Sequence, residues 1–231
     1  MQRLAAIVEL LKESNKRIED SREAEGTGFL SFDPERIAQT VLELSAISRP
    51  PRSVLDLGCG NGQFALLAAA AGYPSYGIEI EPRLIDEARH LHEICVERNL
   101  IDKNIPCRFV AGDMIPFEYR EQYRKFRTEH NENEASMPIS EDTSDPYKEL
   151  GTSIQTADII YCWSWPGQSR FLYNLLEDIA KPDCVFILPS YERYTQGEHM
   201  NAAFKERNRL VLTRLAEVQG QTSIFIGRRA Q

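Results

Sequence analysis

The stretch Val54-Leu-Asp-Leu-Gly-Cys-Gly-Asn-Gly62 decides the fold of this chain of 231 residues. Four residues of strand character enter a turn with glycine at every second position, and an apolar run rich in alanine follows at 63–71. Glycines between a strand and a helix let the backbone come close to a ligand and leave helix N–H groups facing it. The stretch therefore predicts a ligand-binding strand–turn–helix unit, and a tight turn without a ligand is the less favoured interpretation.

Strand and helix patterns alternate along the rest of the chain. Beyond the first strand we expect strands at 75–80, 107–111, 157–163, 184–189, 210–215 and 222–226, and helices at 82–99 and 170–180. Such alternation is typical of an α/β protein with a mostly parallel sheet that helices cover on both faces. The last two strands are joined by a short connection, so we expect them to pair antiparallel at the edge.

Residues 1–52 precede this core domain, which we place at 53–231. Apolar residues recur at helical spacing over 3–20, which predicts an amphipathic helix. Asp33 followed by Pro34 is a favourable start for a second helix, because aspartate caps the first turn and proline fits the first helical position. We therefore expect helices ahead of the first strand.

The charge of the chain is unevenly distributed. The 27 basic and 35 acidic residues give a formal net charge of -8, and residues 129–149 contain seven acidic residues and a single lysine. A segment with this much charge and almost no large apolar side chains cannot offset the entropy of ordering. We therefore predict a disordered acidic insertion at 129–149. The sequence has no strongly basic stripe, and we do not expect DNA as a partner.

Composition also bears on the compartment and on metal binding. The five cysteines lack the C-x-x-C spacing of common zinc sites, which favours reduced thiols, a cytoplasmic location and no bound metal. No apolar run approaches the ~18 residues of a membrane helix, and the first residues lack the apolar core of a secretory signal. We therefore expect a cytoplasmic protein without a membrane partner.

Residues at the strand ends restrict the ligand. A dinucleotide-binding G-x-G-x-x-G turn needs glycine where this chain has Gln63. Asp56 lies near the end of the first strand and would repel a pyrophosphate, whereas a ligand with an ammonium group would neutralise it. Glu79 lies near the end of the second strand, where an acid accepts hydrogen bonds from ribose hydroxyls. Glu81, just before Pro82, is interpreted as a helix cap or a solvated charge.

The third strand leads into Val110-Ala-Gly-Asp113-Met114. The Asp113 carboxylate can accept a hydrogen bond from an adenine amino group, and Met114 can pack against the adenine ring. A cap or turn-forming role for Asp113 is the alternative. Together with Glu79, these residues indicate a ligand that contains adenosine.

The combination of V-L-D-L-G-C-G-N-G with G-I-E-I-E-P at 77–82 and V-A-G-D at 110–113 resembles the class I S-adenosylmethionine-dependent methyltransferases. The resemblance implies a Rossmann-like, seven-stranded sheet with one antiparallel strand in the edge region. It also implies S-adenosylmethionine as cofactor and a lid over it from 26–34, in which Phe29 and Phe32 make apolar contacts; ordinary packing of these two side chains is the equal alternative. The cofactor-binding residues that it implies are Asp56, Gly58, Cys59, Gly60, Asn61, Gly62, Glu79, Ile80, Asp113, Met114 and Trp163.

The same resemblance places the fourth strand beside the first, so that Trp163-Ser-Trp-Pro-Gly-Gln168 should border the transferred methyl group. Family members that methylate amino groups of bases usually carry N/D-P-P-Y/F there, and its absence disfavours such a substrate. Ser164, Trp165 and His199 are candidates for the acceptor side, and core packing is the alternative for each of Trp163 and Trp165. The acceptor stays open among a small molecule, a protein and RNA.

Two other functions compete with an active methyltransferase. A catalytically silent protein that binds S-adenosylmethionine and acts through partners would keep the same Asp56, Glu79 and Asp113. An NAD-dependent enzyme is disfavoured by Gln63 and by Asp56.

Overall fold

A computed structural model describes residues 2–21, 29, 32–48, 50, 52–129, 144–162, 169–191, 210–217 and 222–229. The helices are α1 (Gln2–Asp20), α2 (Pro34–Ile47), α3 (Gln63–Ala70), α4 (Pro82–Glu97), α5 (Arg120–Glu129), α6 (Pro146–Leu150) and α7 (Ser169–Ile179), with a short 3-10 helix, η2 (Phe117–Tyr119). The strands are β1 (Val54–Leu57), β2 (Ser75–Glu79), β3 (Cys107–Ala111), β4 (Ile159–Cys162), β5 (Val185–Tyr191), β6 (Leu210–Glu217) and β7 (Thr222–Arg229).

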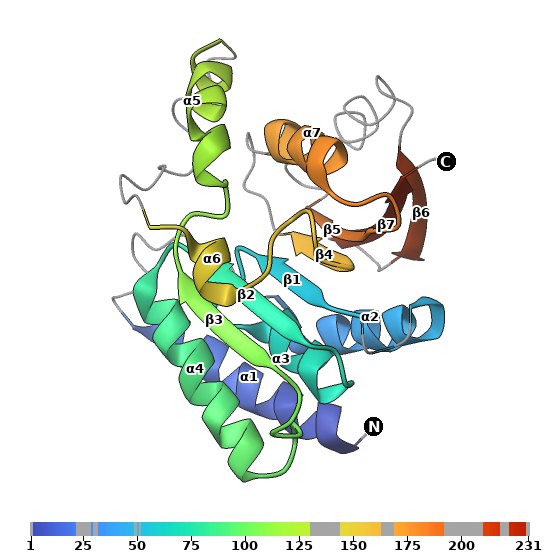
Figure 1. The fold of residues 1–231 in the computed structure, drawn as a ribbon. Helices are drawn as coiled ribbons and strands as arrows, with labels where there is room; N and C mark the ends of the chain where they lie inside the picture. The colour runs from blue at the N-terminus through green and yellow to red at the C-terminus, as the bar shows by residue number, and fades with distance from the viewer. Residues whose placement is uncertain are drawn as a thin grey trace.

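The strands form one sheet in the order β3-β2-β1-β4-β5-β7-β6 (Figure 1). The pairs from β3 to β5 are all parallel, which confirms the predicted α/β architecture with a parallel sheet. β7 runs antiparallel to both of its neighbours, β5 and β6. β1 therefore lies in the interior of the sheet, and its carboxyl end opens onto the edge where parallel α/β proteins bind ligands.

Helices cover both faces of the sheet, and each face has its own hydrophobic core (Figure 1). Successive side chains of a strand point to opposite faces. Accordingly Val54 packs with α1, α2, α3 and α4, whereas Leu55 and Leu57 pack with α6 and α7. Asp56 is in the same phase as Val54, so this register directs its carboxylate towards α3.

The N-terminal helices pack on the first of these faces. The predicted helix at 3–20 is confirmed as α1, and its apolar positions Leu4, Ile7, Val8 and Leu11 are buried in one core with residues of α3. The predicted start of α2 is also confirmed, because the Asp33 carboxylate accepts a hydrogen bond from the N–H of Glu35 at 3.1 Å.

The disorder predicted for 129–149 is wrong at both described ends of that range. Glu129 is the last residue of α5, and residues 144–149 lead into and form most of α6. The Asp145 side chain caps α6, and Tyr147 is buried in the core beside α7. Pro146 packs closely against Gly112, because a Cβ added at Gly112 would lie 2.8 Å from Cβ of Pro146. Charge alone misled the sequence interpretation, because Pro146 and Tyr147 supply the packing that offsets the ordering entropy. Residues 130–143 lie outside the described residues.

The buried Tyr147 hydroxyl ties α6 to the segment that follows β3. It donates a hydrogen bond to the main-chain carbonyl of Met114. We expect Tyr147→Phe to lower the free energy of unfolding by about 1–3 kcal/mol, because the buried carbonyl loses its partner while the ring volume is kept. Urea denaturation measures this change. An unchanged midpoint would mean that water replaces the hydroxyl and that α6 is not held through this bond.

Candidate functional site

The glycine turn leaves β1 and enters α3 with three residues in the left-handed region. The φ angles are 75° at Gly58, 54° at Gly60 and 82° at Gly62. The N–H groups of Gly58 and Cys59 both donate to the carbonyl of Ile78 on β2, at 2.9 and 3.0 Å. The turn is therefore bound to the neighbouring strand, and its shape depends on residues without a side chain at these angles.

Asp56 is a buried carboxylate that lacks a full set of partners. The residue is 1% exposed, and its Oδ2 accepts a hydrogen bond from the N–H of Ala65 in the first turn of α3 at 3.2 Å. Among the described residues, nothing donates to its Oδ1. Burial raises the pKa of Asp56 to about 8, a net value that includes a lowering by the Ala65 N–H bond and a smaller raising by the nearby charge of Glu79. A buried acceptor in this state favours a ligand that brings a donor, above all a cationic one.

Glu79 lies on the adjacent strand and is bonded to the turn. Its Oε2 accepts from the N–H of Gly60 at 3.0 Å, and its Oε1 accepts from the N–H groups of Ile80 and Glu81 at 2.8 and 3.1 Å. Burial raises the pKa of Glu79, and these backbone donors lower it in part. The Glu81 side chain caps α4 by accepting from the N–H of Arg83, as the sequence predicted.

Asp113 makes a turn-forming contact in the structure, which is the role that the sequence offered as an alternative to adenine binding. Its Oδ1 accepts a hydrogen bond from the N–H of Ile115 at 2.8 Å, and its Oδ2 lies 3.7 Å from Nε of the buried Arg120. Met114 is 5% exposed and packs in the core on the α7 face of the sheet. Arg120 could not be found from a sequence motif, because its partner lies seven positions away across a 3-10 helix.

The side chain of Asn61 is directed at α1. Its Nδ2 donates to Ser14 Oγ at 2.9 Å and to Asn15 Oδ1 at 3.0 Å, and Gln63 Nε2 donates to the same Asn15 oxygen at 3.1 Å. All four side chains are buried. Ser14 and Asn15 belong to no sequence motif, and the signal that points to them is two polar residues on the otherwise apolar face of α1.

Of the two phenylalanines of the expected lid, Phe29 lies against the turn and Phe32 packs with the core that α1 shares. A Cβ added at Gly60 would lie 3.2 Å from Cε2 of Phe29, so the absence of a side chain at Gly60 leaves room for the ring. Residues 22–28, 30 and 31 are outside the described part of the chain.

The candidates on the acceptor side, Trp163, Ser164, Trp165 and His199, lie outside the described residues. β4 ends at Cys162, which pairs with Leu57 of β1, so the chain leaves this strand beside the glycine turn. Among the described residues no group of His, Cys, Asp or Glu side chains is arranged to hold a metal ion. Within the same part of the chain, the helices are too short or too polar to cross a membrane.

The fold and this site define an α/β protein with a ligand-binding turn at the carboxyl end of its first strand. Residues 29–206 match the family model described as "Methyltransferase domain". The chain therefore belongs to the methyltransferase domain family.

Curated relatives match only one part of the chain. The ribosomal protein L11 methyltransferase of Paraburkholderia phytofirmans is 45% identical over 69 residues, which is 29% of this chain and 22% of that protein. The match thus spans about a fifth of the relative's length.

Solved structures match over nearly the whole chain. An O-methyltransferase from Bacillus cereus in complex with SAH has a TM-score of 0.59 and 15% identity over 100% of this chain and 91% of that one. An RNA methyltransferase from Salinibacter ruber in complex with S-adenosyl-L-homocysteine has a TM-score of 0.52 and 17% identity over 88% and 95%. At these identities the likeness establishes the fold.

Proposed function

We propose that this protein is a methyltransferase that uses S-adenosylmethionine as its cofactor. The family of the chain supports the reaction class, and two structures of the same fold were obtained with S-adenosylhomocysteine, the demethylated form. The observation that carries the proposal is the buried Asp56 carboxylate beside the glycine turn, with one oxygen that has no donor among the described residues. An α-ammonium group supplies the missing donor and the opposite charge.

The residues of the turn and the strand ends fit the other parts of this cofactor. Each carboxylate oxygen accepts about two hydrogen bonds. Oε1 of Glu79 already has two backbone donors and Oε2 has one, so Oε2 keeps a place for one ribose hydroxyl. In this proposal the left-handed backbone of Gly58, Gly60 and Gly62 shapes the turn for the methionine part, and Asp113 and Met114 serve the adenine.

The chemistry then depends on positioning. When bound, S-adenosylmethionine supplies a methyl group on a positively charged sulfur. Asp56 holds the ammonium group of the amino acid part, and Glu79 holds the ribose. The acceptor then needs only to approach the methyl group in line. The stretch after Cys162 leaves β4 beside the turn, and in this proposal Trp163 borders the cofactor while Ser164, Trp165 and His199 serve the acceptor.

The acceptor in this proposal is a small molecule, a protein or RNA. A single experiment sorts these classes: transfer of a tritiated methyl group to fractionated cell lysate, with label counted in protein, RNA and small-molecule pools. Isothermal titration with S-adenosylmethionine, S-adenosylhomocysteine and NAD tests the cofactor. Binding of NAD in place of the other two would refute the proposal, and binding of S-adenosylmethionine without transfer to any pool would indicate the silent binding protein.

Glu79→Gln is expected to raise the Kd for S-adenosylmethionine about tenfold or more, because the amide presents a donor where the ribose hydroxyl and backbone N–H groups require an acceptor. The melting temperature should fall too, since one backbone donor loses its partner. A 2′-deoxy cofactor analogue separates the two effects: it should lose less affinity in the variant than in the wild type. Glu81→Gln is the matched control and should leave the Kd unchanged. If the effect of the 2′-deoxy analogue depended on the substitution at Glu81 and not on the one at Glu79, the ribose contact would belong to Glu81, two residues later.

A further inference from the structure

The buried face of α1 changes character at its carboxyl-terminal half. Ile7, Val8 and Leu11 are apolar, but the next two residues at the same helical spacing are Ser14, 0% exposed, and Asn15, 6% exposed. Buried polar side chains cost stability unless they find partners. Their presence at core positions indicates hydrogen bonds to neighbouring segments, which apolar residues could not form.

Asn15 holds both sides of the entry into α3. Its Oδ1 accepts from Asn61 Nδ2 at 3.0 Å and from Gln63 Nε2 at 3.1 Å. Asn61 stands between Gly60 and Gly62, both in the left-handed region, so its side chain anchors the turn where the backbone is least restrained by sterics. Gly60 itself donates to Glu79, and the turn is thus bound on one side to β2 and on the other to α1.

The same asparagine also bonds Phe32, one of the two phenylalanines of the expected lid. Asn15 Nδ2 donates to the main-chain carbonyl of Phe32 at 3.3 Å. Phe29, three residues earlier, lies against Gly60. One side chain therefore bonds the glycine turn through its oxygen and the segment next to that turn through its nitrogen.

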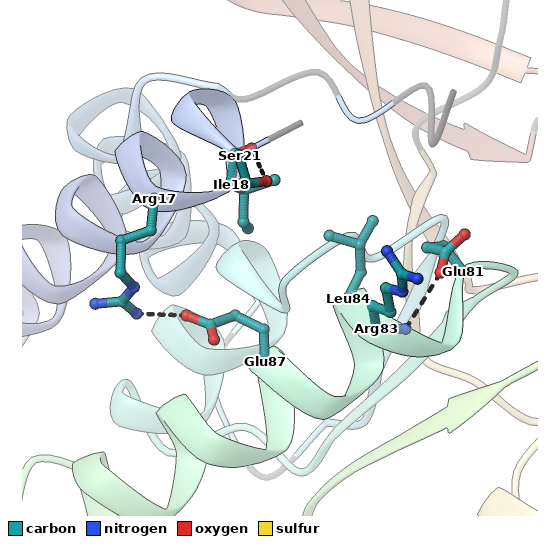
Figure 2. Close-up of a pocket in the computed structure, with 7 residues that line it drawn as sticks. All are labelled: Arg17, Ile18, Ser21, Glu81, Arg83, Leu84 and Glu87. Carbon is teal, nitrogen blue, oxygen red and sulfur yellow. Dashed lines mark hydrogen bonds and ion pairs between the residues drawn. The ribbon is translucent and has the colours of Figure 1, made fainter. Parts of the chain in front are cut away.

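The network continues to α4, the helix that follows Glu79 and Glu81. Ser14 accepts from Asn61 and donates to Glu87 Oε1 at 2.7 Å. Arg17 Nη2 donates to the same Glu87 oxygen at 2.6 Å, and Figure 2 shows this pair bridging α1 and α4 at the rim of a pocket between the two helices. The network that begins at Asn61 thus reaches α4 through Ser14 and Glu87.

We propose that Asn15 is a positioning residue that couples Phe29 and Phe32 to the glycine turn, so that these two residues and the turn loosen together and the cofactor is released when they do. The proposal rests on the proposed function for its cofactor readout. The coupling itself is a property of the free protein, and it can be measured without any ligand.

Two variants cut the network on opposite sides of Asn15. Asn15→Asp keeps an oxygen that accepts from Asn61 and Gln63, and in its ionised form, which alkaline pH favours, it cannot donate to Phe32. Asn61→Ala removes the two bonds from the turn to Ser14 and Asn15 and leaves the Asn15–Phe32 bond in place. Lys12→Ala is the matched control on α1, because Lys12 pairs only with the exposed Glu9 and Glu35 in the contacts described and takes no part in the network.

Hydrogen exchange of the free protein, well below the melting temperature, tests the coupling. We expect Asn15→Asp to speed exchange at 58–63, although its bonds to the turn are intact. We expect Asn61→Ala to speed exchange at Phe29, Phe32 and Asp33, although the bond from Asn15 to Phe32 is intact. Lys12→Ala should change neither. If each variant speeds exchange only on the side it cuts, Asn15 is an ordinary buried structural residue and the proposal is wrong.

Release of S-adenosylhomocysteine, followed by stopped flow, is the second readout. We expect both network variants to release it about five- to tenfold faster than the wild type and the Lys12→Ala control, as loss of one buried hydrogen bond from the bound state predicts. Wild-type release rates in both variants would overturn the proposal. A wild-type protein that does not bind S-adenosylhomocysteine at all would refute the proposed function instead, and the exchange experiment would still decide the coupling.

Discussion

Asp56→Asn is expected to weaken binding of S-adenosylmethionine by about 10- to 150-fold at pH 8, because it removes a charge-assisted hydrogen bond worth about 1.5–3 kcal/mol. The substitution preserves shape and can keep the bond from the N–H of Ala65, so the fold should persist. Isothermal titration measures the change. 5′-Methylthioadenosine, which lacks the amino acid part, is the control ligand and should bind the two proteins equally.

The pH dependence of binding sharpens this prediction. Burial raises the pKa of Asp56 to about 8, so the carboxyl group is neutral below that pH in the free protein. Binding of an ammonium group to the wild type should therefore strengthen as pH rises towards 8, by up to about tenfold per pH unit. Asp56→Asn should abolish that slope. An equal slope in both proteins would remove Asp56 from the ammonium site.

The Asp56 carboxyl group should also make the stability of the free protein depend on pH. Its folded pKa lies above the ordinary aspartate value of 3.8, so the folded state retains a proton that the unfolded state gives up. The stability that this provides is complete below about pH 4 and is lost as pH rises to about 8. The melting temperature of the wild type should thus fall relative to that of Asp56→Asn across this window.

Gly62→Ala is expected to lower the free energy of unfolding by about 2–5 kcal/mol, the sum of left-handed strain and overpacking. Gly62 has a φ of 82°, and an added Cβ would lie 2.8 Å from Cε1 of Phe109 and 3.0 Å from Cβ of Ala88. Both neighbours are buried, so neither has room to move away. Urea denaturation measures the loss.

Gly151→Ala supplies the control for backbone strain. Gly151 has a similar φ of 72°, but nothing lies within 4 Å of the place where its Cβ would be. This substitution should cost only the left-handed strain, about 1–2 kcal/mol. Equal losses in the two variants would show that the wall formed by Phe109 and Ala88 yields, and that Gly62 is required for its backbone angle alone.

The sequence by itself determined the features that depend on neighbouring residues. The apolar run of β1 and the glycines after it predict a buried strand and a ligand-binding turn, because strand burial and left-handed backbone angles are local properties. The helix caps were predicted for the same reason: Asp33 and Glu81 each accept from the N–H two positions later. Such bonds form whatever the rest of the chain does.

Only the tertiary structure decided where the polar side chains of the site are directed. Asn61 belongs to the turn that the sequence assigns to the cofactor, and its side chain bonds Asn15, which lies 46 positions earlier in the chain. Asp113 meets Arg120, and Tyr147 reaches Met114, 33 positions away. A polar side chain turns towards whichever donors and acceptors burial brings near it, and that depends on how distant segments pack. The type of a residue and its place on a strand therefore identify the site, whereas its partners are set by the assembled fold.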